Sequence, residues 1–176
     1  NELVSTIFDD DLSCFPAEEF SSDEWLEILA RVGLKTNVDK EAFLQCAWKV
    51  EADGVVPKAM KLLRYYHEHF GDFFDSGQGE FGRKLASIQC VPAEKHGAEI
   101  SLYKFCDVAV PKDRHVVFKV LPVIPEHVCP PQVMFSTLGI VSPPTITTVL
   151  KQTRALTEEN DILDHWSYTH GTVDEV

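Results

Sequence analysis

The pattern of apolar residues changes near the middle of the chain, and this change limits the possible folds most strongly. Before residue 76, apolar residues recur at the three- and four-residue spacing of amphipathic helices. After the glycine-rich stretch 76–82, apolar runs are short, rich in Ile, Val and aromatic residues, and bounded by Pro, Gly or Asp, as in strands. The order predicts an α+β fold with a helical N-terminal half, a small mixed or antiparallel sheet, and C-terminal helices.

Three helices are predicted in the N-terminal half, and the first two show amphipathic spacing with a candidate core aromatic residue in each. The first spans residues 23–32 and carries Trp25 on its apolar side. The second spans about residues 40–51 and ends at Asp53-Gly54, with Asp39 as its N-cap and Phe43 on its apolar stripe. We therefore expect Trp25 and Phe43 to be core residues.

The third predicted helix begins at Pro57 and runs to about residue 70, where Gly71 ends it. Residues 1–20 hold short apolar patches around an acidic run and predict loop or short strand. The chain begins without Met and stops within a segment, so we expect one compact unit from a longer protein. Its predicted parts are an acidic lead-in (1–20), a helical subdomain (21–75), and a strand-then-helix subdomain (76–176) packed on it.

The second half of the chain predicts a sheet followed by helices. Strands are expected at 85–91, 99–105 and 115–120. Arg114 and His115 would then begin the central strand and lie exposed. Further helices are expected from Pro131 to Leu138 with a stop at Gly139, after the cap signal Ser142-Pro143, and over 157–168.

The charge of the chain excludes some classes of partner. Its 176 residues carry 16 Lys and Arg against 28 Asp and Glu, a net charge of -12 that repels nucleic acid and anionic lipid. Residues 1–27 hold nine of the acids and residues 157–176 six, without Lys or Arg, which leaves 13 acids against 16 bases between them. No apolar run approaches the roughly 20 residues that span a bilayer. Neither nucleic acid nor a membrane is therefore expected as a partner.

The cysteines indicate a reducing compartment. The five cysteines form an odd set without a CxxC pair, and a disulfide-stapled secreted domain would be shorter and denser in Cys. Cys46 and Cys90 lie in apolar stretches, where free Cys behaves as a small hydrophobe. We expect a cytoplasmic location.

Catalytic and metal-binding patterns are weak. His67 and His69 are two apart on a helix and point away from each other, so they cannot share one ion. His127 and Cys129 lack the four-ligand spacing of zinc sites. No strained nucleophile turn is present. We expect no enzyme activity, no metal and no cofactor.

A glycine-rich stretch leaves one alternative open. Residues 77–82 have GxGxxG spacing and precede Arg83 and Lys84, which is compatible with a phosphate-binding loop. The stretch precedes the predicted strands instead of following one. A flexible connection between the two halves is the competing interpretation.

Exposed aromatic residues are the candidates for protein contact. Phe73 and Phe74 follow a glycine helix stop, and Phe15 lies in an acidic loop. Apolar clusters rimmed by acids mark protein-binding surfaces, although these rings can instead fold back into the core. Together with Arg114, the three phenylalanines are the predicted contact residues.

Several stretches, taken in order and spacing, resemble the internal repeat regions of the sacsin family of giant multidomain co-chaperones. They are Trp25 to Leu29, Val32 to Lys35, Phe43 with Leu44 and Ala47, Leu85 to Ile88, Val91-Pro92, Leu102 to Pro111, Val120 to Pro122, Leu138 to Ile140, Ser142 to Pro144, and Val149-Leu150. The likeness covers about residues 15–176. The resemblance implies a repeat that begins with a GHKL-type ATPase-like module, of which this chain is the continuation.

The expected function is therefore that of a non-catalytic structural and protein-interaction segment, working with the heat-shock chaperone machinery in protein quality control. The expected partners are neighbouring repeats of the same chain, and heat-shock chaperones or client proteins. The alternative is that the segment belongs to a GHKL-type nucleotide-binding unit and contributes Arg83 or Lys84 to a phosphate-contacting loop.

Overall fold

The chain folds into a mostly helical body with a small sheet at its middle. The structure, a computed structural model, describes residues 2–9, 20, 22–31, 33, 38–73 and 79–170, with side chains only up to residue 158. The helices and strands are α1 (Glu2–Ile7), α2 (Asp23–Arg31), α3 (Lys40–Asp53), α4 (Val56–Glu68), α5 (Phe70–Phe73), α6 (Glu80–Ser87), β1 (Val91–Ala93), β2 (Ser101–Tyr103), α7 (Arg114–Val117), α8 (Phe135–Leu138) and α9 (Ile146–His170). This order confirms the predicted α+β class.

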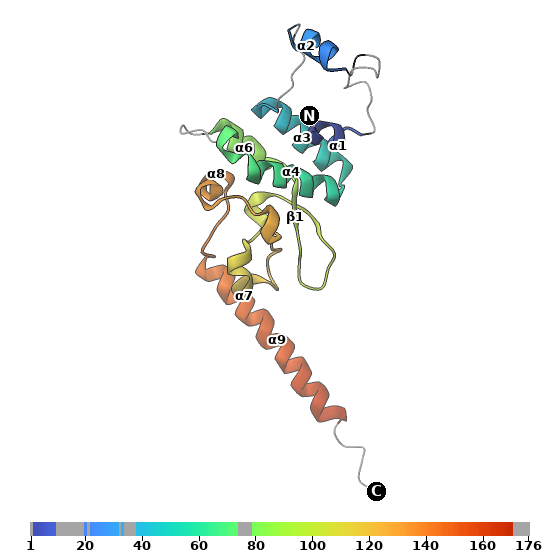
Figure 1. The fold of residues 1–176 in the computed structure, drawn as a ribbon. Coiled ribbons are helices and arrows are strands. Elements are labelled where there is room, and N and C mark those ends of the chain that lie inside the picture. The colour runs from blue at the N-terminus through green and yellow to red at the C-terminus, as the bar shows by residue number, and fades with distance from the viewer. Residues whose placement is uncertain are drawn as a thin grey trace.

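The body has a helical layer above a sheet and short helical turns. Helices α1, α3, α4 and α6 lie together in one layer, and α4 packs against β1 below it (Figure 1). Helix α2 lies apart from the body at one end, and α9 extends away from it at the other (Figure 1). The larger buried apolar cluster runs from Leu3 to Ile140, so the helical layer and the sheet share one core, and a smaller second cluster holds Ala109, Val117 and Val123.

The ends of α3 follow the local chemistry that the sequence indicates. The Oδ1 atom of Asp39 accepts a hydrogen bond of 2.8 Å from the backbone N–H of Ala42, which satisfies a free donor of the first turn. Gly54 takes a φ of 67° after the last turn, and its N–H donates to the carbonyl of Val50. Both predicted helix ends are confirmed.

Four aromatic rings from four helices meet in the upper core. We call Phe43 of α3, Tyr66 of α4, Phe73 of α5 and Phe81 of α6 the aromatic cluster. The centroid of the Phe43 ring lies 4.8 Å from that of Phe73, 5.5 Å from Tyr66 and 6.0 Å from Phe81. Phe43 is fully buried, as predicted, and it contacts every other ring of the cluster.

The sheet is smaller than the sequence predicts. Strands β1 and β2 pair antiparallel with Pro92 opposite Leu102, and β2 lies inside the predicted strand 99–105. The predicted strand 85–91 is wrong except at Val91, because residues 85–87 end α6 and residues 88–90 connect it to β1 through a bend. The predicted strand 115–120 is also wrong, because this run begins within α7. A short continuous apolar run fits a buried helical turn as well as a strand, so periodicity cannot separate them.

Two predictions about the N-terminal part are corrected. The first helix forms as α2, but Trp25 is 43% exposed, so it is not a core residue. An amphipathic pattern shows which side of a helix is apolar and does not show what covers it. Residues 2–7 form the helix α1, with Leu3 and Ile7 buried, where loop or short strand was predicted.

The helix ends near Gly71 and in the C-terminal part differ from expectation. Gly71 does not end a helix but lies within α5, after α4 has ended at Glu68. The stop at Gly139 is confirmed by its φ of 76° after α8. A helix does follow the Ser142-Pro143 signal, but it begins only at Ile146, and as α9 it continues unbroken through the separately predicted stretch 157–168.

Candidate protein-contact site

The predicted contact residues lie in different environments. Phe73 is 2% exposed within the aromatic cluster, so it is a core residue and not a contact surface. Phe15 and Phe74 lie outside the described residues. Arg114 is exposed at the start of α7, and its Nη2 lies 3.2 Å from Oε2 of Glu94. Of the two predicted residues that the structure describes, Phe73 and Arg114, only Arg114 is exposed.

The first turns of α9 present apolar side chains to solvent. Ile146 is 80% exposed and Leu150 is 64% exposed. The two residues are four apart on a helix, so they lie on one side of it, and we call them the α9 patch. On the opposite side, Gln152 is buried, and its Oε1 accepts a 2.9 Å hydrogen bond from the backbone N–H of Lys119. Helix α9 is therefore held on the body through one face and leaves its apolar patch uncovered.

Helix α2 presents a second uncovered apolar surface. Trp25 is 43% exposed and Ile28 is 48% exposed, and the two residues are three apart on the helix. The ring of Phe20 lies edge-on to Trp25 with its centroid at 5.2 Å. None of the residues of α2 is buried. Both helices that stand away from the body in Figure 1 therefore carry exposed apolar side chains.

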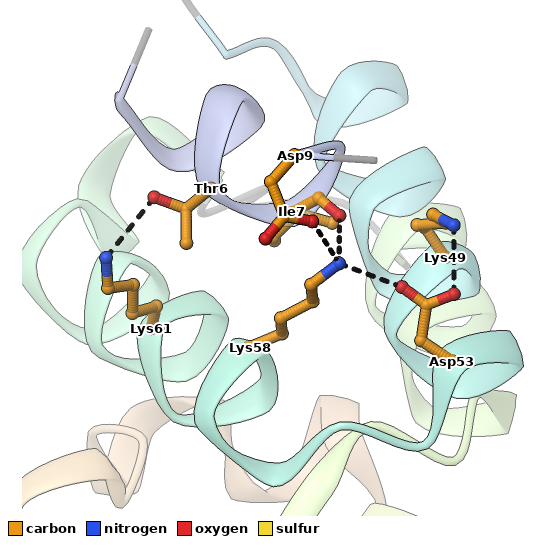
Figure 2. Close-up of polar contacts among 7 residues, drawn as sticks. All are labelled: Thr6, Ile7, Asp9, Lys49, Asp53, Lys58 and Lys61. Carbon is orange, nitrogen blue, oxygen red and sulfur yellow. Dashed lines mark hydrogen bonds and ion pairs between the residues drawn. The ribbon is translucent and has the colours of Figure 1, made fainter. Parts of the chain in front are cut away.

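A polar network fixes the N-terminal segment to the helical layer (Figure 2). The Nζ atom of Lys58 donates to the backbone carbonyl of Ile7 at 2.8 Å, to Oδ1 of Asp9 at 2.7 Å and to Oδ2 of Asp53 at 3.1 Å. Asp53 also accepts a 2.9 Å hydrogen bond from Lys49. The hydrogen bond to Asp9 raises the pKa of Lys58. The network keeps this amine charged, so it joins α1 to α4 and does not supply a nucleophile.

The same network predicts a stability change in acid. Hydrogen bonds from Lys49, and then from Lys58, lower the pKa of Asp53 below its ordinary value of 3.8. The folded state therefore binds this proton more weakly than the unfolded state, and the stabilisation is present above pH about 4 and is lost as the pH falls through the folded-state pKa. The urea midpoint should decrease between pH 5 and pH 3, and this decrease should be smaller in Asp53→Asn than in the wild type.

A matched control separates this effect from the general loss of charge in acid. Glu158→Gln removes a carboxylate that is 70% exposed on α9. This variant should show the same decrease in urea midpoint as the wild type. Equal decreases in the urea midpoints of Asp53→Asn and Glu158→Gln would contradict the assignment of the acid effect to Asp53.

The glycine-rich stretch takes a helical form over its second half. Gly79 precedes the first turn of α6, and Gly82 lies inside the helix instead of in a loop. A Cβ atom at position 82 would overlap the Cγ2 of Thr137 in α8, so a steric contact requires glycine here. The Nζ of Lys84 lies 2.8 Å from Oε1 of Glu80. The described residues thus explain Gly82 by packing, and phosphate contact by Arg83 or Lys84 stays a prediction.

His67 and His69 have structural partners, and Cys46 and Cys90 are buried. His67 Nδ1 lies 2.8 Å from the carbonyl oxygen of Cys129, and the ring of His69 stacks on Tyr65 at 4.1 Å. Burial raises the pKa of the Cys46 thiol to about 11 and that of Cys90 to about 12, so neither is a reactive thiolate. Over the residues that the structure describes, no group of three or more His, Cys, Asp or Glu side chains is placed to hold a metal ion.

Comparison of the chain with models of protein families, with curated proteins and with solved structures gave no match. Within the described part of the chain, no helix is both long and apolar enough to cross a membrane. The similarity to the sacsin repeat regions therefore stays a prediction from the residues.

Proposed function

We propose that this chain is a non-catalytic structural and protein-interaction segment of a giant, sacsin-like co-chaperone that works with the heat-shock chaperone machinery in protein quality control. The α9 patch carries the proposal, because Ile146 and Leu150 stay exposed on a helix whose other face is anchored to the body. Apolar side chains exposed together on one surface favour contact with another protein. The partner is a neighbouring repeat of the same protein or an unfolded client chain.

The cytoplasm is the compartment that we propose. Cys46, Cys90, Cys106 and Cys129 are all free thiols in the structure. Free thiols are typical of a reducing compartment, where disulfides are rarely kept.

Light scattering of a heat-unfolding client protein tests the proposal. The wild-type chain at equimolar ratio should suppress light scattering by citrate synthase as that client unfolds on heating. Ile146→Asp with Leu150→Asp should remove most of this suppression, because it places two charges on the α9 patch.

The control adds the same charge to the same helix but away from the patch. Lys151→Glu changes the charge of α9 by the same two units at an exposed position about 100° or more around the helix from both patch residues, and it should leave the suppression intact. If the chain neither suppresses scattering nor associates with the adjacent segments of its parent protein, the proposed function is wrong. If the double variant and Lys151→Glu lose the suppression equally, the client binds another surface.

A further inference from the structure

An open hollow of about 520 Å³ lies at the start of α7. Arg114 and His115 come from the first turn of α7, and Phe118 follows its end. Pro111 belongs to the 3-10 turn before the helix, and His96 belongs to the turn between β1 and β2. The fold thus gathers cationic and aromatic side chains from two separate segments around one open space.

Arg114, the cationic residue of this hollow, can exchange its ion-pair partner Glu94 for another carboxylate. The Arg114 and Glu94 side chains are 57% and 46% exposed, and their one close contact is 3.2 Å long. An exposed ion pair of this kind contributes little to stability, since water screens it. The guanidinium has five N–H donors in a fork that fits a carboxylate through two parallel hydrogen bonds. A carboxylate from another chain can therefore replace Glu94 at small cost.

The wall of the hollow beside Arg114 is apolar. The ring of Phe118 meets the ring of His96 edge-on, with centroids 5.1 Å apart and an interplanar angle of 83°. This contact holds the Phe118 ring in place, and Pro111 adds a second rigid apolar surface. A ligand that fits both features has a carboxylate next to an apolar side chain.

The distribution of charge along the chain indicates the class of partner. Residues 28–156 carry 16 bases against 13 acids, whereas the flanking parts 1–27 and 157–176 hold only acids among their charged residues. This part of the chain is slightly basic although the whole chain carries a net charge of -12, and the exposed guanidinium of Arg114 is complementary to a carboxylate. An arginine beside an apolar wall therefore favours an acidic peptide that carries an apolar side chain.

We propose that this hollow binds an acidic peptide segment of a partner protein, with Arg114 holding a carboxylate in place of Glu94 and with Phe118 and Pro111 packing against an adjacent apolar side chain. The site is distinct from the α9 patch, and the proposal does not depend on client binding there.

Fluorescence anisotropy of the full chain with a labelled Asp-Asp-Asp-Leu-Phe peptide tests the proposal at low salt. Arg114→Gln should weaken binding roughly tenfold, because a charge-assisted hydrogen bond is lost. Glu94→Gln should tighten binding about two- to fivefold, because the competing carboxylate is removed. A purely structural role for the Arg114–Glu94 pair would not predict opposite effects.

Matched controls complete the experiment. Arg154→Gln removes an arginine that is 82% exposed on α9 and should leave binding unchanged, as should the Ile146→Asp, Leu150→Asp variant. An Asn-Asn-Asn-Leu-Phe peptide should bind at least tenfold more weakly than the acidic one. Loss of peptide binding in Arg114→Gln with intact suppression of scattering would support two independent sites.

Several outcomes would overturn the proposal. Equal binding of the neutral and acidic peptides would remove the role of the carboxylate. Equal affinities of Arg114→Gln and Arg154→Gln would remove the role of Arg114, and weaker binding by Glu94→Gln would show that Glu94 supports the ligand and does not compete with it. Tighter, Arg114-dependent binding of a single-stranded oligothymidine would assign the hollow to phosphate groups instead.

Discussion

Phe43→Ala is expected to lower the free energy of unfolding by about 3–5 kcal/mol, because it removes a fully buried ring and leaves a cavity. Phe43 contacts the rings of Tyr66, Phe73 and Phe81, which come from three other helices. Edge-on and tilted ring pairs contribute stability beyond the area that they bury. Urea denaturation followed by circular dichroism measures the loss.

The control for Phe43 lies in the same helix. Trp48 is 44% exposed on α3, so Trp48→Ala should cost less than about 1 kcal/mol although it removes a larger ring. Phe43→Leu keeps most of the volume and should cost less than Phe43→Ala, which keeps the comparison measurable if Phe43→Ala does not fold. A cost below about 1 kcal/mol for Phe43→Ala would show that the buried face of α3 is assigned wrongly.

Gly82→Ala should destabilise the protein by about 1–2 kcal/mol, although alanine is the better helix former. The added Cβ would overlap the Cγ2 of Thr137, where α6 packs against α8. Threonine is branched at Cβ and has few alternative rotamers, so it cannot easily move away. Thermal or urea unfolding of the single variant measures the cost.

Two further variants show whether the contact is the cause. Gly71 also lies in a helix, but a Cβ there would meet no atom within 4 Å, so Gly71→Ala should stabilise the protein by up to about 1 kcal/mol. In a Thr137→Ala background the overlapping methyl group is absent, and Gly82→Ala should become neutral or stabilising. Destabilisation by Gly82→Ala that persists in this background would contradict the steric explanation.

Both ends of α3 and its buried face could be predicted from the sequence. The side chain of Asp39 bonds a backbone group three residues away, and Gly54 closes the same helix through a contact four residues back. Such interactions depend on residues that are close in the chain, so the residue types and their spacing predict them. The buried position of Phe43 followed from the same spacing.

The sequence could not predict which apolar helix faces are covered by other segments, or which residues far apart in the chain are in contact. Trp25 and Phe43 occupy equivalent places in amphipathic patterns, yet one is exposed and the other fully buried. The position of Lys58 in its helix gave no sign of its bond to the carbonyl of Ile7, 51 positions away. The hollow at Arg114 likewise exists only because the turn at His96 reaches the start of α7.

The amino-acid sequence by itself determined the α+β class, most helices of the N-terminal half and the acidic flanks of a slightly basic middle. The tertiary structure alone decided that 115–120 starts in a helix, that Gly82 is a packing residue, and that the α9 patch and the hollow are open to solvent. Helix capping and helical periodicity act over about four residues, so they depend on nearby residues and not on the rest of the fold. Burial depends on which distant segments meet, and that follows from the packing of the whole chain.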